Sequence, residues 1–105
     1  NDVESTTALA GSGANLILFT TGLGTPTGNP VSPVIKISSN TEISETMEEI
    51  IDINAGSIID GNYTIEGKAK ELWNYIIDVA SGNKISKAVI REQHDFIPWK
   101  RDISL

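Results

Sequence analysis

The sequence predicts a small α/β domain, Rossmann-like and layered, with a short, mostly parallel sheet flanked by helices. Residues 16–19 form a continuous apolar run that is too short for most helices and does not alternate, as in strands buried on both faces of a sheet. Residues 34–38 form a second strand-like run, and apolar residues from about 66 to 81 recur at helical spacing. The order helix, strand, loop, strand, helices is typical of a layered α/β unit.

Length and composition narrow the class of protein. At 105 residues we expect one domain with a modest core, covering residues 1–105. The net charge of −6 argues against nucleic-acid binding, because phosphate contacts need clustered Lys and Arg. Cysteine is absent, which excludes disulfides and thiolate chemistry and fits a cytoplasmic location. No apolar run approaches the roughly 18 residues of a membrane span, and we expect no contact with a membrane.

The first helix is expected over residues 3–10, with Asp2 as its N-cap and Gly11 and Gly13 at its end. The chain begins with Asn1 at what is already the start of a helix. We therefore expect that residues upstream of Asn1 have been removed.

Ser39 and Glu42 have the spacing of a capping box and predict a short helix after the second strand. Residues 51–53 predict a third strand or an extended turn. Asn54 is expected to cap a further short helix that stops at Gly61.

The strongest helical pattern covers residues 66–81, with Gly82 as its stop. A weaker helix is expected over residues 86–93, and residues 96–105 predict an edge strand or a packed tail. The residues expected on the buried face of the strong helix are Ala69, Leu72, Trp73, Ile76, Ile77 and Ala80.

Residues 20–33 form the most unusual segment. It holds three of the nine glycines, three of the four prolines and four threonines, a composition that neither a helix nor a central strand tolerates. A loop of this length in a small domain is usually functional or disordered, and its tightly flanking apolar strands favour a functional role. A structural Gly–Pro loop is the competing interpretation.

The start of this loop predicts a binding site at the end of a buried strand, the edge where open α/β sheets bind ligands. Glycine lets backbone N–H groups approach an anion, and Thr hydroxyls can donate to carboxylate or phosphate oxygens. The candidate binding residues in this segment are Thr20, Thr21, Gly22, Gly24 and Thr25. A dinucleotide fingerprint does not fit, because the spacing from Gly24 to Gly28 is one residue too long.

Two charged residues are candidate catalytic groups. Lys36 lies within the second strand, where it either faces an active site and stabilises an oxyanion or occupies the exposed face of an edge strand. Asp52 either binds a divalent cation or caps the next helix, and capping is the favoured interpretation. His94 is the only histidine and has no partner at a catalytic spacing, so we expect a surface residue.

The run from Gly13 to Pro26, with Phe-Thr-Thr-Gly-Leu-Gly-Thr-Pro at its centre, resembles the signature of the altronate and galactarate dehydratase family. The resemblance continues through residues 34–40, and three further stretches agree in order, at residues 1–5, 52–56 and 99–101. One position departs from the pattern, because many members carry Arg where this chain has Leu23. Arg would be a natural carboxylate clamp, so the substrate or its anchoring group can differ here.

The resemblance implies a hydro-lyase that dehydrates a sugar acid, with D-altronate favoured, to a 2-keto-3-deoxy acid. It further implies a divalent metal, iron(II) or manganese(II), bound mostly outside this segment by ligands that the sequence does not identify. The expected catalytic residues are Lys36 and Asp52, and Asn40 and Asn54 join the loop residues as expected substrate-binding groups. Upstream domains of the same polypeptide are the expected partners, and a homo-oligomer is compatible with the sequence. The alternative is a non-catalytic module that binds a small anion or nucleotide through the Thr/Gly loop.

Overall fold

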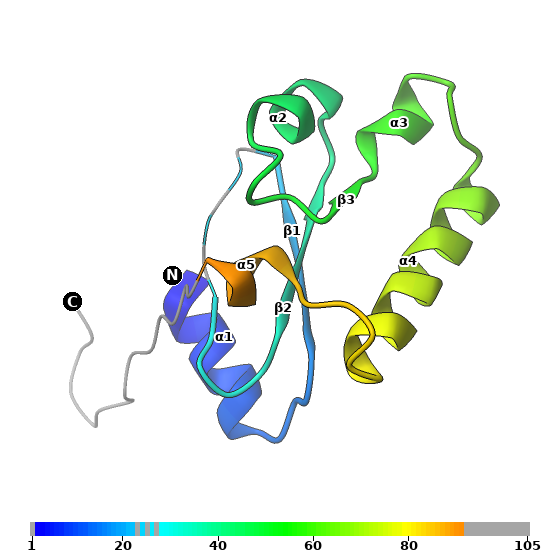
Figure 1. Ribbon diagram of the computed structural model, residues 1–105. Coiled ribbons are helices and arrows are strands. Elements are labelled where there is room, and N and C mark those ends of the chain that lie inside the picture. The colour runs from blue at the N-terminus through cyan, green and yellow to red at the C-terminus, as the bar shows by residue number, and fades with distance from the viewer. Residues whose placement is uncertain (1, 23, 25, 27, 92–105) are drawn as a thin grey trace.

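The computed structural model describes residues 2–91 apart from residues 23, 25 and 27 (Figure 1). The elements in chain order are α1 (Asp2–Gly11), β1 (Ile17–Thr21), β2 (Val34–Ser38), α2 (Thr41–Thr46), β3 (Ile53–Asn54), α3 (Gly56–Ile59), α4 (Ile65–Ala80) and α5 (Lys87–Ile90). None of the helices in this part of the chain is long and apolar enough to cross a membrane. Leu23, Thr25, His94 and the predicted tail at residues 96–105 lie outside the described residues.

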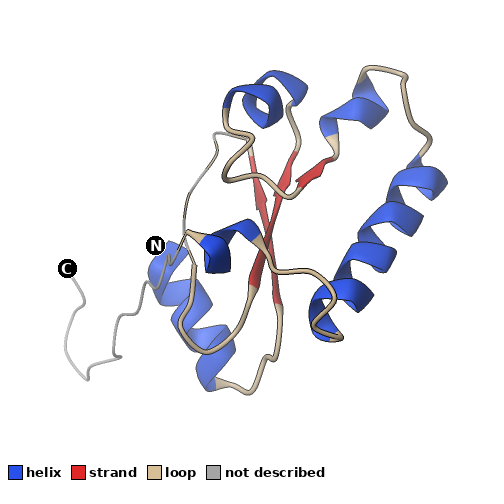
Figure 2. Ribbon diagram, in the orientation of Figure 1, coloured by secondary structure: helices blue, strands red, loops and turns tan. Residues whose placement is uncertain are grey.

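The three strands form one parallel sheet in the order β1-β2-β3, with helices on both sides (Figure 2). The expected α/β class is therefore confirmed. The connection from β2 to β3 contains α2, whereas the described residues between β1 and β2 form a loop without a helix. In this respect the sheet differs from a Rossmann unit, in which a helix joins consecutive parallel strands.

Burial differs sharply between the two longer strands. All five residues of β2 are buried, because this strand lies between β1 and β3 and both of its faces are covered. In β1 only Ile17 is buried, and Leu18 is 46% exposed. The prediction that residues 16–19 are buried on both faces is wrong, because β1 lies at the edge of the sheet among the described residues and no helix there covers Leu18.

Alternation along the strands sends side chains into two separate apolar clusters. Ile35, Ile37 and Ile53 pack on one face of the sheet against Val79 of α4. Ile17 and Val34 pack on the other face against Ala88 of α5. The sheet is thus covered by α4 on one side, and by α5 together with α1 on the other (Figure 1).

Helix α4 confirms the helix predicted over residues 66–81, and Leu72 and Ile76 pack on the sheet as predicted, but the rest of the predicted face is exposed. Val79 is buried, and Leu72, Tyr75 and Ile76 pack against the sheet cluster. Trp73 is 61% exposed, Ile77 is 44% exposed, and Ala69 and Ala80 are also exposed. The predicted core position of Trp73 is therefore wrong here, because apolar spacing identifies a wide arc but not the part of it that meets the sheet.

The N-cap of α2 is Asn40 and not the predicted Ser39. The Asn40 side chain accepts a hydrogen bond of 3.2 Å from Ile43 N, while Ser39 N is bonded to Thr21 O in the sheet ladder. Extension of the β ladder by one residue therefore moves the start of the helix by one position. The helix predicted after Asn54 is confirmed as α3, and Asn54 Oδ1 accepts from Gly56 N at 2.9 Å.

Gly56 allows the first residue of α3 to approach the start of α2. A Cβ added at Gly56 would lie 2.5 Å from Thr41 N and 2.9 Å from Asn40 C, both of them backbone atoms. Only glycine fits such a close backbone approach. This contact brings the carboxyl ends of β2 and β3, and the short helices that follow them, to one place.

Gly56→Ala is expected to lower the free energy of unfolding by about 1–3 kcal/mol, because the added methyl group overlaps backbone that cannot move aside. Chemical denaturation of the chain measures the effect. Gly11→Ala is the matched control, since a Cβ there would meet nothing within 4 Å. Equal stability of the two variants would contradict this account of the contact.

Candidate functional site

Three polar residues from three strands lie side by side at the carboxyl edge of the sheet. Thr21 is paired with Ser38, and Ser38 is paired with Asn54. Directly opposed residues in a parallel sheet point to the same face, so the three side chains form one row, which we call the carboxyl-edge row. Ligands of open α/β sheets bind at this edge.

The two adjacent threonines of the motif do not share a face. Thr21 belongs to the carboxyl-edge row, whereas Thr20 is opposed to Ile37 and lies, exposed, on the side of α4. The Thr21 hydroxyl accepts a hydrogen bond of 3.0 Å from Gly24 N, which folds the start of the loop back over the strand end. The structure therefore separates two residues that the sequence grouped together.

Gly24 has a φ of +80° and lies against α2. A Cβ at this position would overlap Met47 Sδ and lie 3.2 Å from Ile43 Cγ2, so the loop approaches α2 more closely than a larger residue allows. Gly22 is exposed beside Ser39. The glycines thus place the backbone of the loop at the same edge as the carboxyl-edge row.

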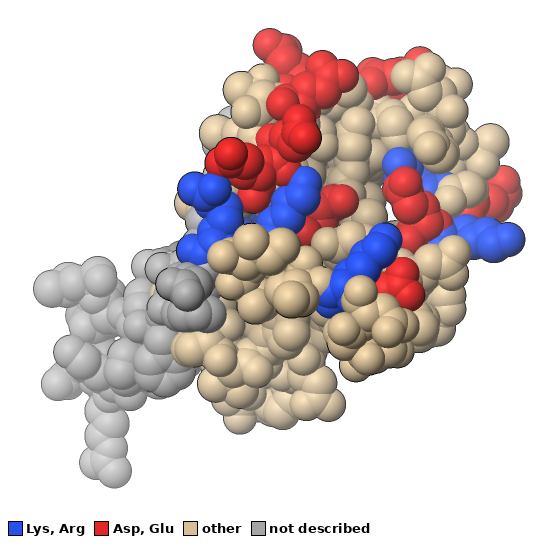
Figure 3. Space-filling model, viewed as in Figure 1, with Lys and Arg blue, Asp and Glu red and all other residues tan. Residues whose placement is uncertain are grey.

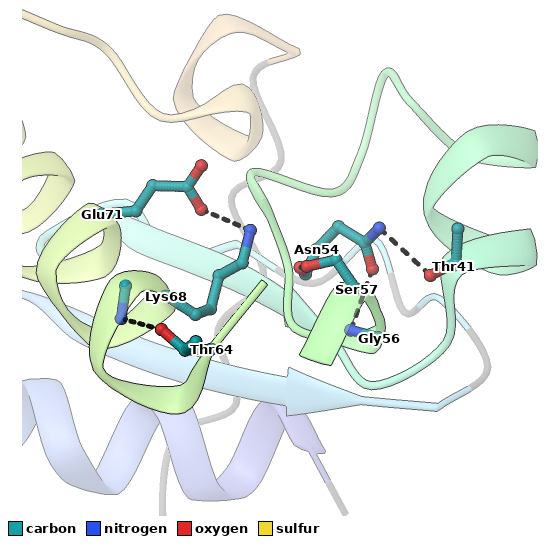
Figure 4. A network of polar contacts seen from close by, with 8 residues as sticks. Thr41, Asn54, Gly56, Ser57, Thr64, Lys68 and Glu71 are labelled. Atoms are coloured by element: carbon teal, nitrogen blue, oxygen red, sulfur yellow. Dashed lines mark hydrogen bonds and ion pairs between the residues drawn. The ribbon is translucent and has the colours of Figure 1, made fainter. Parts of the chain in front are cut away.

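Side chains that follow β2 and β3 are joined by hydrogen bonds (Figure 4). Asn54 Nδ2 donates to Thr41 Oγ1 at 3.3 Å, and Thr41 Oγ1 in turn donates to Asp60. Ser38 Oγ donates to Asn40 O at 2.9 Å and accepts from Asn40 N at 3.1 Å. With Gly56 N also bound, both polar atoms of the Asn54 amide are engaged within the fold. This arrangement indicates that Asn54 orders the edge.

A polar hollow of about 360 Å³ opens between α2 and α3 at this edge. It offers hydroxyl, amide and carboxylate groups to a ligand. Its lining consists of Ser39, Asn40, Thr41, Glu42, Gly56, Ile59 and Asp60.

Lys36 is the most deeply buried charged residue that the structure describes, with 0% exposure at the centre of β2. The alternative that it occupies an exposed edge-strand face is therefore wrong. By alternation its side chain lies on the same face as Ser38, one step below the carboxyl-edge row. The structure thus places the buried Lys36 side chain beneath the carboxyl-edge row.

Asp52 accepts three hydrogen bonds from three different elements. Its Oδ2 accepts from Lys36 N at 2.8 Å, and its Oδ1 accepts from Tyr75 OH at 2.8 Å and Lys87 N at 3.0 Å. The prediction that Asp52 caps the next helix, α3, is wrong, because it binds the first residue of α5 instead. Each hydrogen bond to a carboxylate contributes about 1.5–3 kcal/mol, so the three together are a substantial structural tie.

Further polar contacts hold α5 against the segment between α2 and β3. Lys87 Nζ donates to Ile51 O at 2.8 Å and also to Glu48 O, and Arg91 Nη1 lies 2.7 Å from Glu49 Oε2. Acidic side chains gather over α2 and the residues after it, with basic side chains bordering them below (Figure 3). The exposed Arg91 pair is worth little by itself, whereas the Lys87 bonds to backbone carbonyls fix the start of α5.

Tyr75 is the partner of Asp52 on α4. Burial, the hydrogen bond to Asp52 and the nearby Asp52 charge, in that order, raise the pKa of the Tyr75 hydroxyl above its ordinary value. The hydroxyl therefore remains protonated and donates to the carboxylate throughout the neutral range.

The described residues do not fit a divalent metal. In the part of the chain that the structure describes, no three His, Cys, Asp or Glu side chains come together as ligands. Both oxygens of Asp52 are already bound to N–H and O–H donors, and a cation there would have to displace them.

Three residues of this region, Ser38, Thr41 and Tyr75, are not predicted from the sequence. Ser38 could have been found by counting strand alternation from Lys36, and by pairing the two strand ends. Thr41 and Tyr75 contact Asn54 and Asp52 from 13 and 23 residues away, and no local pattern signals such contacts.

The parallel sheet, with a glycine-containing loop and polar residues at its carboxyl edge, defines a small α/β domain. Residues 1–104 match a family model described as D-galactarate/Altronate dehydratase, C-terminal, and the chain belongs to this family. The resemblance seen in the sequence is therefore confirmed.

Three curated relatives show the range of the family. The chain is 40% identical over 96 residues to altronate dehydratase of Bacillus subtilis, covering 91% of this chain and 18% of that protein. It is 43% identical over 84 residues to galactarate dehydratase (L-threo-forming) of Escherichia coli, covering 80% and 16%. It is 32% identical over 79 residues to (2R)-sulfolactate sulfo-lyase subunit beta of Chromohalobacter salexigens, covering 75% and 20%. The chain thus spans a fifth or less of each of these relatives.

Tyr75→Phe is expected to lower the free energy of unfolding at neutral pH by about 1–3 kcal/mol, because it removes one donor from Asp52. The pKa of Tyr75 is higher in the folded than in the unfolded chain, so its contribution is complete below about pH 10 and is lost as the pH rises further. Denaturation at neutral and alkaline pH measures both effects.

The alkaline loss of stability should be smaller in Tyr75→Phe than in the parent chain. Tyr63→Phe, which leaves the bond to Asp52 in place, is the matched control. Identical alkaline slopes for the parent chain and Tyr75→Phe would show that the Tyr75 proton is not linked to folding.

Proposed function

We propose that this chain supplies the carboxy-terminal part of a hydro-lyase that dehydrates a sugar acid, with D-altronate as the first candidate, to a 2-keto-3-deoxy acid. The carboxyl-edge row beside the Thr-Gly loop is the structural observation that carries the proposal. It places short polar side chains and the backbone of the Thr-Gly loop together at one sheet edge, the position where open α/β sheets bind ligands.

The names of the relatives support elimination chemistry. Two are dehydratases of sugar acids and one is a sulfo-lyase, so all three are named as enzymes. A non-catalytic anion- or nucleotide-binding module is accordingly not favoured. A cytoplasmic location remains part of the proposal.

Dehydration of a sugar acid requires a base that removes the proton next to the carboxylate, and groups that hold the resulting enediolate. We propose that the Thr21 hydroxyl, the Gly22 amide and the Asn40 side chain bind substrate oxygens, and that Gly24, whose N–H is bonded to Thr21 Oγ1, positions that hydroxyl. Lys36 would contribute its positive charge from beneath, and Asp52 and Asn54 would hold the surrounding backbone in place.

The base and the ligands of a divalent metal, iron(II) or manganese(II), are proposed to lie outside the described residues. Such a metal would supply positive charge toward the developing enediolate. The part of this chain in catalysis is then to bind and orient the substrate.

The test offers D-altronate and galactarate separately to the intact protein, with iron(II) or manganese(II), and follows formation of the keto-deoxy acid. Turnover of D-altronate in preference to galactarate supports the proposal as stated. Turnover of galactarate alone would support the proposed dehydration but identify galactarate as the substrate. Turnover of neither compound would refute the proposed function.

Thr21→Val is expected to lower kcat/KM of the intact protein by about 10–100-fold, the range for loss of one or two hydrogen bonds to a charged group. Thr20→Val is the matched control, because the same substitution one residue away removes an exposed hydroxyl from the opposite face. We expect a change of less than about threefold for Thr20→Val, which is under 1 kcal/mol. A larger loss for Thr20→Val than for Thr21→Val would mean that the substrate binds on the α4 side.

The 105-residue chain alone is expected to show no dehydratase turnover when substrate and metal are added. The reason is that the proposed base and metal ligands lie elsewhere in the enzyme. The same keto-acid assay checks this expectation, with the intact protein as the positive control. Turnover by the chain alone would mean that it holds a complete active site.

A further inference from the structure

Helix α4 has a wider apolar surface than the sheet can cover. At about 100° per residue, its apolar side chains from Tyr75 round to Ile77 spread over an arc of roughly 200°. Only the half that contains Leu72, Tyr75 and Val79 packs on the sheet. The other half, with Ala69, Trp73, Ile77 and Ala80, is exposed.

The contacts of α4 fix the direction of the exposed half. The polar residues Glu71, Asn74 and Asp78 line a hollow of about 570 Å³ together with Asp52 and Ile53, so the polar side of α4 is turned toward β3. The part of the helix surface next to this polar side, with Leu72 and Val79, packs on the sheet. The exposed apolar half is therefore turned the other way, toward the β1 side.

On that side the sheet also leaves apolar surface uncovered. Leu18 of β1 is opposed to Ile35, so it lies on the α4 face of the sheet, and it is 46% exposed. The outer edge of β1 pairs with no strand of the described residues. We call the exposed apolar residues on this side of the fold the α4–β1 apolar face; they are Leu18, Ala69, Trp73, Ile77 and Ala80.

We propose that the α4–β1 apolar face is the surface against which the preceding part of the same polypeptide docks. This inference rests on the proposed function, in which the chain is one part of a larger enzyme. About four fifths of each relative's length lies outside its match to this chain, and the family model describes a C-terminal part. The part of the polypeptide that precedes this chain is therefore the partner that we propose for this face.

The chemistry of the face agrees with a protein partner. None of its five residues is charged, so it offers nothing to a nucleic acid or an anionic ligand. A large exposed Trp beside aliphatic side chains is typical of the centre of a protein contact. The sequence pattern independently predicts burial both for Trp73 and Ile77 and for the run that includes Leu18. All three are left uncovered on the same side of the fold.

The first test places a photo-cross-linking phenylalanine derivative at position 73 of the intact protein, and at position 74 as the control. Asn74 is exposed on the polar side of the same helix. We expect position 73, and not position 74, to cross-link to peptides that precede this chain in the polypeptide. Mixing isotopically light and heavy protein shows whether the link lies within one copy.

Links within one copy to the preceding part support the proposal. Links to residues 92–105, links to a second copy, or the absence of links from position 73 would overturn it. The cross-linking requires no turnover, so its outcome is independent of the dehydratase assay. Turnover without the expected links would refute only the docking surface, and the expected links without turnover would refute only the proposed function.

The second test compares Trp73→Lys and Ile77→Lys with Asn74→Lys in the intact protein. A charge in a buried apolar contact loosens it, so protease cleavage between this chain and the preceding part should be about tenfold faster for the first two variants. Asn74→Lys should leave the rate unchanged. Equal rates for the three variants would contradict the docking surface.

Discussion

The carboxylate of Asp52 is the contact on which the arrangement of this domain depends. Asp52 directly precedes β3 and lies beside Lys36 of β2. Its carboxylate accepts hydrogen bonds from the backbone of β2, from the hydroxyl of Tyr75 on α4 and from the first N–H of α5. These elements cover opposite faces of the sheet. One side chain therefore joins both helical layers to the central strand.

This tie also bears on the candidate site. The backbone of Asp52 pairs with Lys36 O, and two residues later Asn54 completes the carboxyl-edge row beside Ser38. The alignment of the row therefore depends on the register that Asp52 helps to hold. A residue first considered for catalysis or for metal binding thus has, in this fold, an evident role in ordering the strands that carry the site.

The site is built largely from backbone geometry and short polar side chains. Gly24 and Gly56 permit two close approaches that bring the loop, α2 and α3 to one edge. Asn54, Thr41 and Asp60 then fix the short helices by hydrogen bonds that use their polar atoms within the fold. In the proposed function, this edge is the part of the domain that binds and orients the substrate.

From the sequence alone we could predict the α/β class, the order of strands and helices, the position of the Thr-Gly loop and the family, because these follow from local spacing and from a long specific motif. Which face each element presents depends on tertiary contacts. In the folded domain Thr20 and Thr21 lie on opposite faces of the sheet, and Lys36 is buried. Asp52 accepts a hydrogen bond from α5, and Trp73 is exposed. Apolar periodicity predicts which surface of a helix or strand is buried, but it does not identify the part of the protein that covers this surface. That depends on contacts between residues distant in the chain, and for the α4–β1 apolar face the described residues supply no cover.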